Sequence, residues 1–171
     1  MKKFLSLIVL LLIFGNINAQ NDAVLSRGSF LISAGVGIPQ NGVPVELTVT
    51  YGTLDNVFGF KNLHFGIEYL CSFNFFNPTS NSNLVMGAGP NFHYTLFDNF
   101  DIFAGFNAGW GLDQYIEKMS NHATPGYDAT DLFEYFVNVG IRYSFSDRIG
   151  IYAKGNYSRI SFGAVGVYLK L

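Results

Sequence analysis

Three histidines are the residues of this sequence that most readily suggest chemistry. His64, His93 and His122 do not have the spacing of a metal site. The segments His93–Thr95 ("HYT") and Asn121–Thr124 ("NHAT") each place a histidine near a hydroxyl side chain, the beginning of a hydrolytic site. Neither segment brings a nucleophile, a base and an orienting acid together, so neither predicts catalysis.

Glycine-rich motifs give no stronger signal for an enzyme. The sequence has no phosphate-binding loop, and "GVG" at Gly35 and "GAG" at Gly87 lack the rest of a dinucleotide-binding motif. We therefore expect no enzymatic activity, no cofactor and no metal site.

The composition excludes a nucleic-acid-binding protein and disfavours a soluble one. The chain has 10 Lys and Arg against 12 Asp and Glu, so it lacks a basic surface for phosphates. Charged residues make up 13% of the chain, against about 25% in an average soluble domain. Aromatic residues make up 17%. A single cysteine, Cys71, excludes an intrachain disulfide.

The start of the chain has the anatomy of a cleaved secretory signal. Two lysines precede the apolar run Phe4–Phe14, and Ala19 precedes the expected cleavage point. The apolar run is much shorter than the ~20 residues that a membrane-spanning helix needs. We expect a signal peptide over residues 1–19 and one mature domain over residues 20–171.

Apolar and polar residues alternate in eight short segments of the mature chain, separated by Gly, Asn, Asp, Ser and Pro. A two-residue period is that of a β-strand whose two faces meet different surroundings. No long segment of the mature chain has the apolar pattern of a helix. The predicted strands are 29–38, 43–51, 63–75, 84–96, 102–110, 132–145, 149–157 and 162–171.

The two faces of these predicted strands differ in kind. One row is apolar or aromatic, as in Phe133, Tyr135, Val137 and Val139. The other row is small or polar and carries the mid-strand charges, which are too sparse for a surface in water but suit a narrow packed interior. We predict a lumenal charge network of Glu46, Glu68, Glu134, Arg142, Lys154 and Lys170.

Three glutamates and three cations in this network can neutralise one another. Glu68 and Lys154 belong to strands that lie opposite each other in an eight-stranded barrel, so we expect an ion pair across the interior. An interior filled in this way makes a free aqueous channel unexpected.

Aromatic residues gather at the ends of the predicted strands, as in the girdles of membrane barrels. The predicted girdle residues are Tyr51, Phe97, Trp110, Tyr143, Phe145 and Tyr157.

The links between strands alternate in length, as in outer-membrane barrels, which alternate tight inner turns with long outer loops. Tight links near Asp98 and Asp147 fall on one side, and the longest link, Leu112–Asp131, falls on the other. Thr53–Asn62 falls on the side of the tight turns but is longer than a tight turn. Its length predicts a short helix or an extension of the third strand. The long link 112–131 is where recognition would reside.

The chain closes with "GVYLKL", in which Gly166 is followed after two residues by Leu169 and then by Leu171. Together with the signal and the eight strands, this ending resembles the general outer-membrane β-barrel domain family common in Bacteroidota, related in architecture to the transmembrane domain of OmpA. The resemblance implies that the barrel-assembly machinery reads these three residues as an assembly signal. The family usually ends in an aromatic residue where this chain has Leu171, and its functions are mixed, so it implies little about activity.

These observations predict an all-β protein, an eight-stranded antiparallel up-and-down transmembrane β-barrel preceded by a cleaved signal peptide. We expect a monomer in the outer membrane, surrounded by lipids and lipopolysaccharide, with a structural or surface-interaction role. Three alternatives stay open: a lipid-modifying enzyme, a small porin-like channel, and a soluble periplasmic lipocalin-like barrel with its apolar face turned inward.

Overall fold

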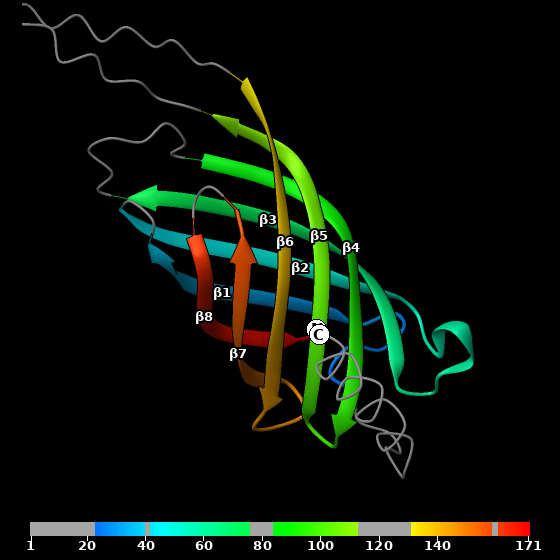
Figure 1. Cartoon of the computed structure of the whole chain (residues 1–171). Helices are drawn as coiled ribbons and strands as arrows, with labels where there is room; N and C mark the ends of the chain where they lie inside the picture. Colours follow the sequence, from blue (N-terminus) through cyan, green and yellow to red (C-terminus); the bar gives the residue numbers. More distant parts are fainter. Residues whose placement is uncertain (1–22, 40–41, 76–83, 113–130, 159–160) are drawn as a thin grey trace, which may run out of the picture.

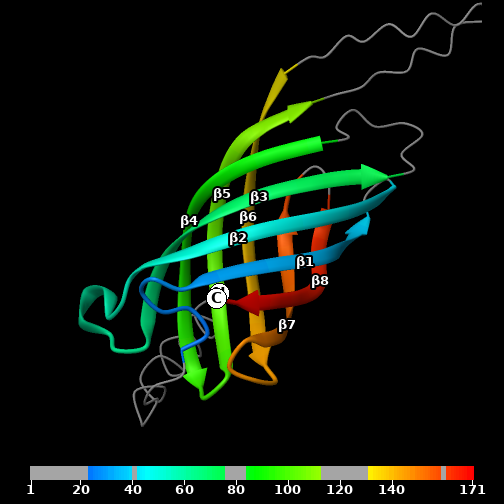
Figure 2. The ribbon, with the colours of Figure 1, turned by 180° about the vertical axis from the view of Figure 1, so that it is seen from behind.

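Eight antiparallel strands form a closed barrel in the computed structural model, which describes residues 23–39, 42–75, 84–112, 131–158 and 161–171. Each strand pairs with its neighbours in the sequence, and β1 pairs with β8 to close the sheet (Figures 1 and 2). The strands are β1 (Phe30–Pro39), β2 (Val43–Leu54), β3 (Leu63–Phe75), β4 (Leu84–Phe97), β5 (Phe100–Leu112), β6 (Asp131–Ser144), β7 (Ile149–Tyr157) and β8 (Ser161–Lys170).

This architecture confirms the predicted fold class, and no predicted strand end differs from the structure by more than three residues. The period-two pattern succeeds because every strand separates two unlike environments along its whole length. The predicted signal peptide over residues 1–19 lies outside the described residues.

The apolar row faces outward and the polar row faces the lumen. Val139 is 58% exposed and Trp110 64% exposed, whereas Glu68 and Arg142 are 1% and 2% exposed. A lipocalin-like barrel would show the reverse, so the structure contradicts that alternative. Closure leaves no strand edge unpaired, which is the condition for a sheet surrounded by lipid.

Three connections lie together at one end of the barrel, named here the inner end, with the C-terminus and residues 23–29 (Figure 1). Two are tight: Asp98–Asn99 between β4 and β5, and 145–148 between β6 and β7. The opposite end is named the outer end. Most of the long link there, residues 113–130, lies outside the described residues.

The third inner connection contains the predicted short helix, the 3₁₀ turn η1 (Val57–Gly59). The proposed extension of the third strand is wrong: β3 starts at Leu63 as predicted, and it is β2 that continues to Leu54. No helix in the described part of the chain is long and apolar enough to cross a membrane.

Two strand glycines show how closely the backbones approach. A Cβ atom on Gly109 would collide with the carbonyl oxygen of Met86 on β4. A Cβ atom on Gly155 would meet nothing closer than the carbonyl oxygen of Val139, at 4.0 Å. Of these two glycines, packing requires Gly109 and leaves room for a side chain at Gly155.

Gly109→Ala is expected to lower the free energy of unfolding by about 1–3 kcal/mol because β4 and β5 must separate to admit the methyl group. Gly155→Ala is the matched control and is expected to be neutral or stabilising by up to about 1 kcal/mol. Urea unfolding in lipid vesicles, followed by the fraction that migrates as folded protein on unheated gels, measures both. Equal midpoints would contradict the close approach of the two strands.

Candidate functional site

The carboxylate of Glu68 is the centre of a polar network that fills the middle of the lumen. Its Oε2 accepts hydrogen bonds from Thr50 Oγ1 at 3.3 Å and Asn91 Nδ2 at 2.9 Å. Its Oε1 accepts one from Asn107 Nδ2 at 2.9 Å. Nη2 of Arg142 lies 3.8 Å from Oε2 of Glu68. Five consecutive strands, β2 to β6, thus converge on one side chain.

Arg142 is the buried cation that matches Glu68. Its guanidinium lies 4.3 Å from the centroid of the Phe103 ring, a cation–π contact that replaces part of the lost hydration. Its Nη1 is 3.3 Å from Nε2 of His93, and Nδ1 of His93 is 2.8 Å from Oδ2 of Asp101. The imidazole thus bridges the guanidinium and a second carboxylate.

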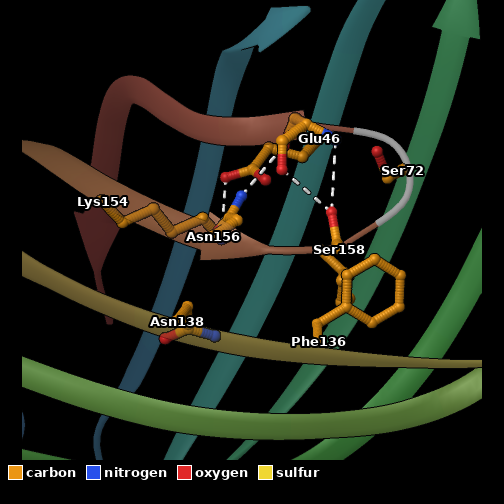
Figure 3. A pocket seen from close by; sticks show the side chains of 9 residues that line it. Glu46, Ser72, Phe136, Asn138, Lys154, Asn156 and Ser158 are labelled. Carbon is orange, nitrogen blue, oxygen red and sulfur yellow. Dashed lines mark hydrogen bonds and ion pairs between the residues drawn. The ribbon is translucent and has the colours of Figure 1, made fainter. Parts of the chain in front are cut away.

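A separate ion pair lies nearer the outer end. Lys154 Nζ is 2.9 Å from Glu46 Oε1, and the hydroxyl of Tyr152 donates to the same oxygen at 2.8 Å. Figure 3 shows Lys154 extended toward Glu46 beside Asn138 and Asn156. The cavity at this point is about 10 Å³, room for about one water molecule.

The structure buries five of the six predicted network residues in the lumen: Glu46, Glu68, Glu134, Arg142 and Lys154. The sixth, Lys170, is half-buried at the inner end, where its Nζ donates to the carbonyl oxygen of Ala23 at 2.7 Å. Glu68 and Lys154 interact electrostatically, but the predicted contact ion pair between them is not formed. Glu68 pairs with Arg142, and Lys154 pairs with Glu46, because opposite strands do not place their side chains at equal heights in a tilted barrel.

Sequence reasoning missed Asp101 and considered His93 only for a metal site or a hydrolytic site. Asp101 is the second residue of β5, just outside the predicted strand 102–110, yet it is fully buried. Its alternation with Phe103 and Gly105 was the available signal, because these positions share the lumenal row of β5.

The second missed feature is an N-terminal strap, residues 23–29, that lies across the inner end of the lumen. Val24 and Leu25 are 1% and 0% exposed and pack in one cluster with Leu31 and Tyr168. Gly28 N donates to Gly52 O at 2.8 Å, so the strap also bonds to β2. The lumen is closed at this end by apolar side chains of the chain itself.

The predicted girdle residues all point away from the lumen, on the outside of the barrel wall. Their exposed fractions run from 37% at Tyr51 to 70% at Tyr157. Neighbouring rings extend the two belts: Trp110 contacts Phe133 with centroids 6.2 Å apart, and Tyr51 contacts Phe30 at 4.7 Å. Phe97, Tyr143 and Phe145 are exposed at the inner end.

The predicted assembly-signal residues are all on or beside β8. Gly166 pairs with Gly35 of β1 and with Tyr152 of β7, and a Cβ atom on Gly166 would collide with the carbonyl oxygen of Ala34. Leu169 and Leu171 are exposed on the apolar row. Their recognition by an assembly machine stays a prediction.

One imidazole–carboxylate pair, His64 with Asp55, lies at the inner end beside the strap. A second pair, His93 with Asp101, lies deep in the lumen. Both side chains have 0% exposure, so a lipid or peptide cannot reach them. Within the described residues, no group of three or more His, Cys, Asp and Glu could hold a metal ion. The site's chemistry is charge compensation inside a packed lumen.

Comparisons with solved structures show the same fold. A de novo designed transmembrane β-barrel is 14% identical, with 85% of this chain and 98% of that one covered and a TM-score of 0.55. The Yersinia pestis outer membrane protein Ail in a phospholipid bilayer nanodisc is 11% identical, with 84% and 98% covered and a TM-score of 0.50. The N-terminal barrel of Pseudomonas aeruginosa OprF is 12% identical, with 85% and 98% covered and a TM-score of 0.49.

The chain therefore has the architecture of the small eight-stranded transmembrane β-barrels, as predicted. At these identities the likeness concerns the fold. No family model and no curated protein matches the chain. An origin in Bacteroidota stays a prediction.

Glu68→Ala should lower the free energy of unfolding by about 3–5 kcal/mol because Arg142 is then buried without its carboxylate. Glu68→Ala combined with Arg142→Met should regain part of this loss, since the uncompensated charge is gone. Asp147→Ala, at an exposed position between β6 and β7, is the control and should stay within about 0.5 kcal/mol of the wild type. Urea unfolding in vesicles measures all three, and a double variant no more stable than Glu68→Ala would contradict the pairing.

Leu25→Ala should lower the free energy of unfolding by about 2–5 kcal/mol if the strap is part of the core, because its side chain is fully buried. Arg27→Ala changes an exposed side chain of the same strap and serves as control. The same urea titration reads out both variants. Equal stabilities would mean that the strap leaves the barrel end in solution.

Proposed function

We propose that the protein is an integral outer-membrane β-barrel with a structural or surface-interaction role and a closed, non-conducting lumen. The observation that carries the proposal is that the barrel is apolar outside and polar inside, the opposite of a soluble barrel. Large apolar side chains such as Val139 and Trp110 face outward, whereas the ion pairs face inward. Such an outer surface is stable in hydrocarbon and costly in water.

The aromatic belts support a transmembrane orientation. Trp110 and Tyr157 lie toward the outer end, and Phe97, Tyr143 and Phe145 lie at the inner end. Aromatic residues gather in girdles at the two interfaces, where the polar edges of Trp and Tyr meet the headgroups. Membrane lipids and lipopolysaccharide are then the first partners of the outer surface.

Export and assembly complete the proposal. Residues 1–19 would direct the chain across the inner membrane and be removed. Gly166, Leu169 and Leu171 would then be read by the barrel-assembly machinery. The paired edges of β1 and β8 fit a monomer, since closure leaves no strand free to pair with another copy.

The structure supports a filled barrel over a channel or a lipid-modifying enzyme. Glu68, Arg142 and their partners occupy the middle of the lumen, and the strap covers the inner end. The imidazole–carboxylate pair deep in the lumen, His93 with Asp101, is inaccessible to a lipid.

Val139→Arg tests the proposal directly. A cation in the middle of the lipid-facing row costs about 2–4 kcal/mol, so the variant should insert poorly and lose the folded, fast-migrating form on unheated gels. Val139→Leu is the matched apolar control and should assemble as the wild type does. Normal assembly of Val139→Arg, or extraction of the wild type from cells without detergent, would rule out the membrane orientation.

A further inference from the structure

The connection between β2 and β3 carries exposed aromatic side chains away from the barrel. Figures 1 and 2 show this loop, which contains η1, projecting sideways from the inner end. The Phe58 side chain is 83% exposed, and Phe60 is 47% exposed. Neither side chain serves the lumenal network, and a tight turn would have joined the two strands.

The backbone at Phe58 is strained. Phe58 has φ 53° and ψ 23°, in the left-handed region that side chains with a Cβ atom disfavour. Its neighbours in that region, Asn56 at φ 54° and Gly59 at φ 82°, are residue types that tolerate it. A bulky residue in this conformation points to a functional constraint at its position.

Hydrogen bonds hold the loop in this shape. Phe60 N donates to Val57 O at 3.1 Å, and Gly59 N donates to Asn56 O at 3.1 Å. At the base, Oδ1 of Asp55 accepts from Arg27 N at 2.9 Å and lies 2.7 Å from Nδ1 of His64.

The far end of the loop is tied to β4, because Thr95 N donates to Asn62 O at 2.9 Å. The loop is therefore fixed to the strap and to the barrel wall, and Phe58 is presented in a defined direction.

We propose that this loop is a membrane-interface anchor, in which Phe58 and Phe60 insert between the headgroups and acyl chains of the phospholipid leaflet at the inner end. Leu54, 53% exposed at the end of β2, continues the lipid-facing row directly into the loop. Lys61 is exposed next to Phe60 and can meet a lipid phosphate. Rings flanked by a cation are the usual composition of interfacial segments.

This inference rests on the proposed function, since it needs the barrel to span a bilayer. The lipid environment supplies what water does not, an apolar surrounding for a ring that the strained backbone holds outward. A protein bound at the loop is the competing occupant, and it would leave Phe58 in water when the barrel stands alone in a vesicle.

Tryptophan fluorescence in brominated vesicles tests the anchor. The chain has one tryptophan, Trp110, so Phe58→Trp in a Trp110→Phe background has a single reporter. The vesicles are phosphatidylcholine brominated either near the headgroup or near the bilayer centre. We expect a blue-shifted emission and stronger quenching by the shallow bromines than by the deep ones.

Asp147→Trp in the same background is the matched control, because it places the reporter on another inner connection flanked by polar Ser146 and Arg148. It should emit at longer wavelength and be quenched less. Phe60→Trp, at an extended backbone position, replaces Phe58→Trp as reporter if the latter does not fold. Emission and quenching of the loop reporter equal to those of Asp147→Trp would overturn the anchor.

Trp110 in the wild type separates the two proposals. Quenching of Trp110 together with an unquenched loop reporter would overturn the anchor and leave the membrane barrel standing. An unquenched Trp110 would instead overturn the membrane barrel on which the anchor rests.

Discussion

The pairing of Glu68 with Arg142 is the interaction on which the interior depends. A barrel of eight strands has an interior only wide enough for side chains, so every lumenal charge must find its partner within a few ångströms. Glu68 does this by accepting three hydrogen bonds and one cation from four other strands. The two asparagine amides beside it and the burial of Arg142 follow from the need to satisfy this carboxylate.

The fold could be predicted from the sequence because each strand shows the two-residue alternation of apolar and polar residues. Each strand reports its two environments through adjacent residues, so Val139 and Asn138 reveal their faces without knowledge of any neighbour. The residues that face the interior could be predicted in the same way. The ion-pair partners could not be predicted. Whether Lys154 contacts Glu68 or Glu46 depends on the stagger between strands, which the sequence of a single strand does not determine.

The other features that the sequence did not predict lie in segments without an alternating pattern, or at the ends of strands. The strap has a single short apolar run and no period, so nothing in Val24 and Leu25 distinguishes a disordered tail from a segment that covers the lumen. Asp101 stands one residue inside β5, where boundaries are hardest to place. The loop around η1 was recognised only by its unexpected length, and its direction comes from left-handed residues that a sequence pattern does not reveal.

The strap also sets an order of events during folding. Leu25 belongs to one buried cluster with Ala164 and Tyr168, which lie at the other end of the chain and join the cluster only when β8 has paired with β1. Contacts between such distant parts of a sequence form late, because the intervening chain must first be organised. The strap can therefore settle only on a barrel that is already complete, so its docking is the chain's own final step in sealing the closed state.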